Sequence, residues 1–171
     1  MATTAIGSSG ITYPNGATNG GYINGGTAVA ATSGTSITFT GIPSWAKRIT
    51  IMFNGVSVSS TSNIQIQIGA GSLVTTGYTG GSSTGTTVID NSTGFIVARN
   101  PAASNVYSGV IVLVTLGSFV WAESGNIISS ASDSCTVSGG NLTLSGALDR
   151  VSVTTTGSDT FDAGSINILY E

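Results

Sequence analysis

The sequence predicts an all-β fold, a β-sandwich or jelly-roll-like antiparallel domain, and three observations lead to this prediction. Short apolar segments recur about every ten residues and are separated by Gly, Asn, Pro and Ser, the residues that form turns. Within many of these segments apolar and polar residues alternate, as they do along a half-buried strand. No long stretch has the 3.6-residue apolar period of an amphipathic helix.

The first strands are the most clearly patterned. Ile37–Thr40 is a short alternating piece, and Lys47–Phe53 has an apolar residue at every second position. Asn54-Gly55 predicts a hairpin turn directly afterwards, because both residues tolerate positive φ. Asn63–Ile68 places three isoleucines on one face and two glutamines on the other, which predicts a strand with one solvated face.

Nine further segments complete a set of twelve predicted strands. They are Thr86–Ile89, Gly94–Ala98, Val106–Leu116, Ser118–Trp121, Asn126–Ser129, Ser134–Val137, Asn141–Ser145, Arg150–Thr155 and Ser165–Tyr170. The Gly-rich segment 80–85 predicts a flexible loop. The uncharged stretch 100–122 is long enough to be weighed as a membrane span, but its Val, Ile, Ser and Gly content favours a buried strand. We therefore expect no membrane insertion.

The chain divides into two parts by composition. Residues 1–35 carry isolated Ile and Tyr side chains among Gly, Asn, Ser and Thr, with too little apolar surface for a core of their own. This part is either a flexible linker or an extended arm packed along a neighbouring subunit. Residues 36–171 are predicted to form the β-sandwich domain.

The charge content is unusually low. Gly, Ser and Thr supply 76 of the 171 residues, whereas Lys and Arg number 4 and Asp and Glu number 7. A disordered chain needs low hydrophobicity and high net charge, and here 40% of residues are hydrophobic and the net charge is −3. The absence of any basic run argues against nucleic acid as a partner. An uncharged but polar surface suits a protein that is held in a larger particle.

The residue types needed for catalysis are scarce. The sequence contains no His, which excludes any triad that uses one. Asp159 and Asp162 form the one close pair of acids, and we expect them to bond the backbone of their own turn. Ser44 and Lys47 match Ser-x-x-Lys, but a turn after a proline does not supply the helix that this motif needs. Cys135 is predicted to be a buried, inert thiol in a strand. We predict no enzymatic activity, no cofactor and no metal.

Binding remains as the predicted activity. Sites for sugars combine an aromatic surface with amide and hydroxyl groups, because sugars offer apolar ring faces fringed by hydroxyls. Loop aromatics and nearby amides therefore give the candidate receptor-binding residues. These are Tyr78, Asn91, Asn105 and Tyr107. Trp45 and Trp121 are instead predicted to lie in the core.

Several segments resemble bacteriophage tail-fibre proteins. The first is Gly41-Ile-Pro-Ser-Trp-Ala-Lys-Arg-Ile-Thr-Ile-Met-Phe-Asn-Gly-Val-Ser57, followed by Ile64-Gln-Ile-Gln-Ile-Gly69 and Thr75-Thr-Gly-Tyr78. A long apolar strand and the ending Gly164-Ser-Ile-Asn-Ile-Leu-Tyr-Glu171 complete the pattern. The resemblance covers roughly residues 27–171, and its motifs mark structure and not a particular activity.

The resemblance implies a function and a location. It implies the C-terminal receptor-binding region of a tail fibre, a homotrimer on the virion that meets the host on its extracellular side. Under this resemblance, the Gly-rich residues 1–35 would be the end of the fibre shaft. Its partners would be a host cell-surface polysaccharide or protein, other copies of itself, and upstream fibre or virion proteins. The alternative is a purely structural virion protein, such as a collar, spacer or capsid decoration, that binds no receptor.

Overall fold

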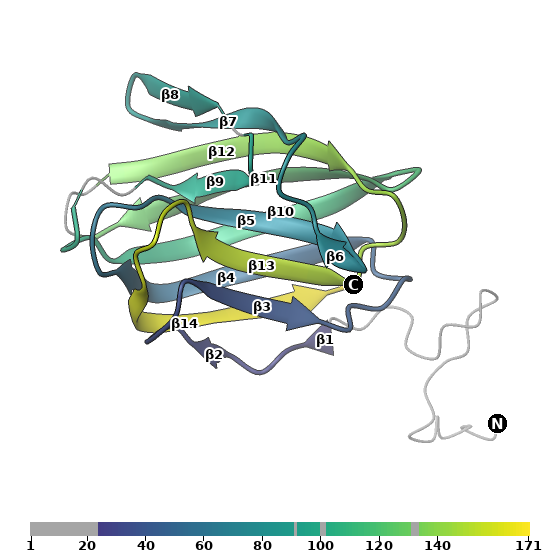
Figure 1. Ribbon diagram of the computed structural model, residues 1–171, viewed down its shortest axis with the longest axis horizontal. Helices are drawn as coiled ribbons and strands as arrows, with labels where there is room; N and C mark the ends of the chain where they lie inside the picture. The colour runs from purple at the N-terminus through teal and green to yellow at the C-terminus, as the bar shows by residue number, and fades with distance from the viewer. Residues whose placement is uncertain (1–23, 91, 100–101, 131–133) are drawn as a thin grey trace, which may run out of the picture.

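A computed structural model describes residues 24–90, 92–99, 102–130 and 134–171 of the chain. All regular secondary structure in these ranges is β, and it forms two antiparallel sheets that pack face to face (Figure 1). The predicted all-β sandwich is therefore confirmed. No helix of the described residues is long and apolar enough to cross a membrane, and residues 107–117 and 120–122 of the uncharged stretch lie in strands β10 and β11.

The larger sheet has nine strands. Its order is β1-β14-β4-β10-β11-β12-β7-β8, and β2 also pairs with β14. The bounds are β1 Asn24–Gly25, β2 Val29–Ala30, β4 Arg48–Val58, β7 Thr79–Thr84, β8 Thr87–Asp90, β10 Tyr107–Gly117, β11 Val120–Ser129, β12 Ser134–Thr143 and β14 Phe161–Tyr170.

The smaller sheet has five strands and lies nearer the viewer in Figure 1. Its order is β3-β13-β5-β6, and β9 also pairs with β5. The bounds are β3 Ser36–Thr40, β5 Ile64–Ala70, β6 Ser72–Leu73, β9 Phe95–Ala98 and β13 Arg150–Thr155. Long strands of both sheets thus come from distant parts of the sequence, as in other sandwiches whose strands cross between layers.

The core lies between the two sheets and is formed by the alternate residues of each strand that point inward. Twelve large side chains are almost fully buried there. They are Tyr107, Phe95, Phe161, Ile49, Ile51, Ile64, Ile66, Ile68, Ile111, Leu113, Ile127 and Ile166. The alternation seen in Lys47–Phe53 and Asn63–Ile68 therefore predicted the buried face of β4 and β5 correctly.

The predicted turn at Asn54-Gly55 is wrong, because β4 continues through it to Val58. Gly55 has φ 65° and Gly164 on the neighbouring β14 has φ 88°, and the register between these strands shifts there. The two backbones approach so closely that a Cβ at Gly164 would lie 2.3 Å from the Gly55 carbonyl oxygen. The positive φ that suggested a hairpin serves a paired β-bulge in the middle of the sheet.

The Gly-rich segment 80–85 is also not a loop, since most of it forms β7 beside β12. A Cβ at Gly80 would lie 2.2 Å from the Gly139 carbonyl oxygen, and one at Gly140 would lie 3.2 Å from the Phe95 ring. Glycine at these positions lets the neighbouring backbone and the Phe95 ring come close. The low strand propensity of glycine does not reveal this role, because it depends on packing against neighbouring strands and not on the local sequence.

Three boundaries differ from the predictions. The described part of the N-terminal region, residues 24–35, contributes β1 and β2 to the edge of the large sheet beside β14. Ser118–Trp121 and Asn126–Ser129 merge into β11, with residues 118–119 forming the turn before it. The two segments predicted at 134–137 and 141–145 likewise merge into β12.

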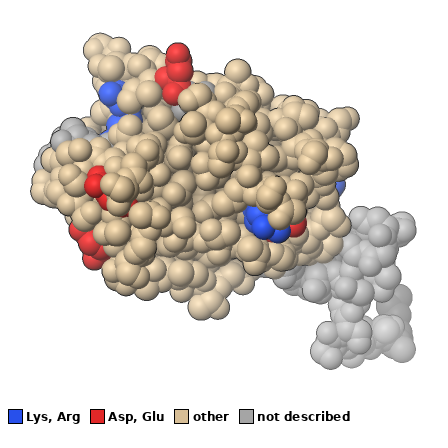
Figure 2. All heavy atoms as spheres, in the orientation of Figure 1, with Lys and Arg blue, Asp and Glu red and all other residues tan. Residues whose placement is uncertain are grey.

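Charged atoms are sparse on the surface. Figure 2 shows them as a few separate groups on an otherwise uncharged face, on the side of the small sheet. Two ion pairs join described residues: Arg48 with Glu171, at 3.2 Å, and Arg150 with Asp149, at 2.8 Å. Both pairs are at least partly exposed, so each adds little to stability.

Candidate functional site

Tyr78, one of the predicted receptor contacts, is part of the core. Its side chain is 4% exposed and packs edge-on against Phe95, with ring centroids 4.8 Å apart. The hydroxyl accepts a hydrogen bond from the Ile68 N–H and donates one to the Val74 carbonyl, both at 2.9 Å. Burial raises the pKa of this phenol to about 12. Tyr78 therefore fixes the 68–78 segment and offers no surface to a receptor.

The other predicted contacts fare similarly. Tyr107 is fully buried, and its hydroxyl donates a hydrogen bond of 2.8 Å to the Arg99 carbonyl. Burial raises its pKa to about 12 as well. Asn105 is buried two residues earlier, and Asn91 lies outside the described residues. The prediction that Tyr78, Asn105 and Tyr107 contact a receptor is therefore wrong, because these buried side chains cannot touch a large ligand.

A cleft opens instead at the end of the sandwich where the C-terminus lies (Figure 1). Its volume is about 350 Å³, which is in the range of small-ligand sites. Three segments line it: the loop before β4, the β10–β11 hairpin and the loop between β12 and β13. The lining residues are Ser44, Ala46, Lys47, Thr115, Gly117, Ser118, Phe119, Trp121, Ala147 and Leu148.

The hairpin turn in this cleft has an unusual backbone. Gly117 pairs with Val120, so Ser118 and Phe119 form a two-residue turn. Their φ angles are 49° and 62°, which a type I′ turn requires and which Asn-Gly normally supplies. Positive φ is strained for a bulky residue such as Phe. Phe119 is also 48% exposed, so the turn places a large apolar side chain at the surface.

The floor and the polar rim of the cleft are well defined. Trp121 is 4% exposed, so its ring forms part of the floor, and Trp121 is a core residue as predicted. Thr115 lies at the rim and its N–H donates a 3.0 Å hydrogen bond to the Lys47 carbonyl. The Lys47 N–H in turn donates one of 2.7 Å to the Glu171 carbonyl. These backbone bonds fix the position of Lys47, which is the one charged residue in the lining.

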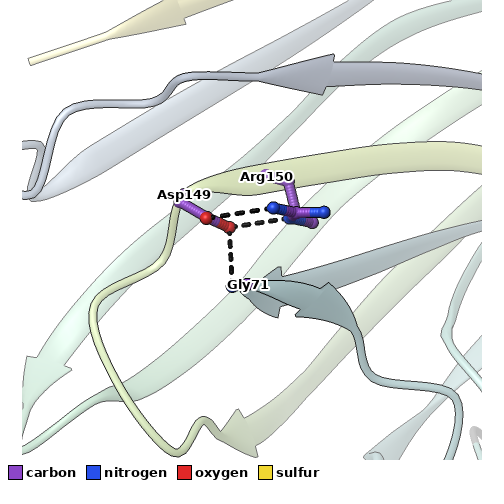
Figure 3. A network of polar contacts seen from close by, with 3 residues as sticks. All are labelled: Gly71, Asp149 and Arg150. Atoms are coloured by element: carbon purple, nitrogen blue, oxygen red, sulfur yellow. Dashed lines mark hydrogen bonds and ion pairs between the residues drawn. The ribbon is translucent and has the colours of Figure 1, made fainter.

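The third loop of the cleft is held by a small polar network (Figure 3). Asp149 accepts hydrogen bonds of 2.8 and 3.1 Å from the Arg150 guanidinium and one of 3.1 Å from the Gly71 N–H. The pKa of Asp149 is lowered, and the hydrogen bonds from Arg150 are the largest cause, because they stabilise the carboxylate. Asp149 directly follows Ala147 and Leu148, so the network fixes the loop that supplies these two lining residues.

A second, smaller hollow lies near the cleft and is marked by aromatics. Its volume is about 140 Å³, and its lining includes Arg48, Tyr170 and Glu171. Trp45 packs on Tyr170 with ring centroids 5.8 Å apart. Trp45 is 36% exposed, so its predicted place in the core is wrong. The residue leaves the core because the turn at 44–45 carries it past the end of the sheets.

The acids of the chain are not assembled into a catalytic pair in the described residues. Asp159 accepts a 2.7 Å hydrogen bond from the Ser62 N–H, and hydrogen bonds from Ser62 lower its pKa. Asp162 accepts a hydrogen bond from the Ser57 hydroxyl. Both acids therefore bond the facing segment 57–62 and not their own turn as expected. No cluster of three potential metal ligands occurs among the described residues.

Glu123 is the one buried acid among the described residues. It is 3% exposed and accepts a 2.7 Å hydrogen bond from the Ser138 hydroxyl, while its Oε2 has no partner among the described residues. Burial raises its pKa to about 7. Its position inside the sandwich, away from the cleft lining, gives it no access to a ligand there.

Sequence reasoning missed the residues that this cleft brings together. Phe119 was assigned to a strand and Lys47 to the start of one. The signal that could have found them is Gly117-Ser118 between two β segments, which marks a turn and therefore an exposed aromatic next to it. The local sequence gives no sign that the loops at 44–47 and 147–148 lie next to the β10–β11 hairpin. No protein-family model, no curated protein and no solved structure matches the chain.

Proposed function

We propose that this chain is a non-enzymatic binding module that uses the cleft at its loop end to hold a bacterial cell-surface glycan. Its setting would be the tip of a phage tail fibre, as the resemblance of its segments implies. The observation that carries the proposal is Phe119, an exposed aromatic residue that lines the cleft and has a positive φ. Residues held in sparsely populated backbone conformations cluster at functional sites.

The chemistry of the lining supports a sugar. Phe119 offers an apolar face, and Ser44, Thr115 and Ser118 offer hydroxyls that can donate and accept hydrogen bonds. Lys47 supplies a single positive charge. None of the residues that line the cleft is Asp, Glu, His or Cys, so it lacks the paired carboxylates that would cleave a glycosidic bond.

The test is a binding screen with a matched pair of variants. Purified chain is applied to a panel of bacterial lipopolysaccharides and capsular polysaccharides, and affinities are measured for the hits. Phe119→Ala is expected to weaken binding roughly tenfold or more, because it removes a central aromatic contact. Val29→Ala serves as the control, since Val29 is an exposed apolar residue on β2 that lines neither the cleft nor the outer face of the large sheet.

Two results would count against the proposal. Equal binding by both variants would place the ligand elsewhere on the molecule. Absence of binding to every polysaccharide, together with no block of phage adsorption to cells, would favour the structural virion role. That alternative draws support from the apolar outer face of the large sheet, which is suited to assembly.

A further inference from the structure

The outer face of the large sheet is apolar where a solvated face would be polar. Along β10, β11 and β12, alternate residues point away from the core, and the exposed ones include large apolar side chains. They are Val110, Val114, Leu116, Ile128 and Val137, and Val88 on β8 is exposed as well. Scattered apolar residues are ordinary on a surface, but a contiguous set on one face marks an interaction site.

Strand β12 turns two apolar side chains outward in its first half. Val137 is 57% exposed and Cys135 is exposed too, whereas Thr136 and Ser138 between and beside them are buried. The prediction of a buried thiol at Cys135 is therefore wrong, although the strand itself is present. The observed register buries Leu142 in the second half of the strand and leaves Val137 and Cys135 available for contact with another surface.

The register of the sheet arranges these residues in flat rows. Directly paired residues on neighbouring strands share a face, and the pairings across β4, β10, β11, β12 and β7 define a central row. This row is Met52, Val110, Asn126, Val137 and Ser83. Asn126 lies in the middle of the row, with Val110 on one side and Val137 on the other. The centre of the row is therefore symmetric about Asn126.

Charge is missing from the outward positions of the central strands β10, β11 and β12. Within β10, β11 and β12 the one charged residue is Glu123, and its side chain is buried on the inner side. Arg48 and Glu171 are at one end of the sheet, where they pair with each other. A face without charge gives no electrostatic selection for a charged partner, and the partner that it complements is another uncharged face.

Asn126 narrows the choice of partner further. Its amide makes no hydrogen bond to another described residue, yet it lies at the centre of an apolar row. A purely apolar partner that covered the row would leave the carbonyl and the NH2 group of the Asn126 side chain without hydrogen bonds. Burying these two groups unsatisfied would weaken the complex. A second asparagine offers the donor and the acceptor that are needed. A second copy of this chain places one there.

We infer that the outer face of the large sheet is the interface between copies of this chain, with Asn126 near the symmetry axis. Symmetry brings the same residue of each copy together at the axis, whether two or three copies meet. The inference does not depend on glycan binding at the cleft, and either proposal can fail without the other.

The first test compares two charged variants by molar mass in solution. Wild-type protein is expected at a whole multiple of the 16.9 kDa chain mass. Val137→Glu is expected to give single chains, because it places like charges in the interface. Ser36→Glu is the control, an exposed strand position on the outer face of the small sheet, and should keep the wild-type mass. Circular dichroism checks that both variants are folded.

The second test locates the axis by cross-linking. Asn126→Cys in a Cys135→Ser background is expected to form a disulfide-linked pair of chains under mild oxidation, and Ser36→Cys in the same background is not. A wild-type mass of 16.9 kDa at every concentration would overturn the inference and leave the face to a different virion protein. It would equally be overturned if Val137→Glu kept the wild-type multiple.

Discussion

The outer faces of the two sheets differ in the polarity of their outward side chains. On the small sheet the outward residues are polar and bond one another: Thr38 meets Ser152 hydroxyl to hydroxyl at 2.9 Å, and Thr93 donates to Gln65 at 3.1 Å. On the large sheet the outward residues of β10 to β12 include Val110, Ile128 and Val137, all exposed. The outward polar groups of the small sheet thus satisfy one another, and Ser152 and Gln65 are buried beneath their partners, whereas the large sheet leaves apolar side chains exposed.

This difference teaches that alternation alone does not say which face is solvated. In β5 the isoleucines face the core and the glutamines face out, which is the common arrangement. In β12 the inward side combines Thr136 and Ser138 with Leu142, and the outward side carries the exposed Val137. The side chains of both strands point alternately inward and outward, but only in β5 does this alternation coincide with apolar and polar residues.

The largest expected effect separates the two faces of one strand. Ile111→Ala on the inner side of β10 should lower the free energy of unfolding by about 2–5 kcal/mol, because Ile111 is fully buried and leaves a cavity. Val110→Ala on the outer side should cost less than about 1 kcal/mol in dilute protein, where single chains dominate. Urea titration measures both, and a comparable loss for the outer variant would break the comparison.

The buried acid of the large sheet should make stability depend on pH. Glu123 titrates near pH 4.5 when unfolded and at about 7 when folded, so the unfolded chain binds fewer protons between these values and stability falls as pH rises. Glu123→Gln removes this loss. We expect the variant to be about 3 kcal/mol more stable than wild type at pH 9 and equal to it at pH 4. A pH-independent difference in thermal melts would contradict the assignment.

The smallest effect concerns the strained hairpin at the end of the large sheet. Replacing Ser118 by Asn and Phe119 by Gly supplies the residues that a type I′ turn prefers. The double variant should gain about 1 kcal/mol in stability, since it relieves positive φ at a bulky residue. It should lose polysaccharide binding at the same time. Lower stability, measured by the same melts, would show that the turn stores no strain.

The sequence was sufficient for the architecture because β-strand alternation is local. Ile64, Ile66 and Ile68 show their buried side within five residues, and no knowledge of the partner strand is needed. Close approach is different: β7 was read as a loop because its glycines make sense only beside Gly139 and Gly140. The turn at Gly55 was misread for the same reason, since its bulge matches one on β14.

The binding site was harder to predict because exposure is a property of the whole fold. Tyr78 and Trp45 both stand beside Gly or Pro-containing turns, yet the first is buried under the small sheet and the second is exposed. Phe119 followed an apolar run and was placed in a strand. Its function in the cleft depends on two loops from positions 44–47 and 147–148, which only the packed sandwich brings near it.

The most direct test of the covered face uses the native thiol. Cys135 lies on the outer side of β12, one strand from Ile128, and it is the one cysteine in the chain. Its rate of reaction with a thiol reagent is measured over a wide range of protein concentration, with unfolded protein as the reference. We predict slow reaction in concentrated protein and fast reaction on dilution, as copies separate and uncover the face. Equally fast reaction at every concentration would contradict the account.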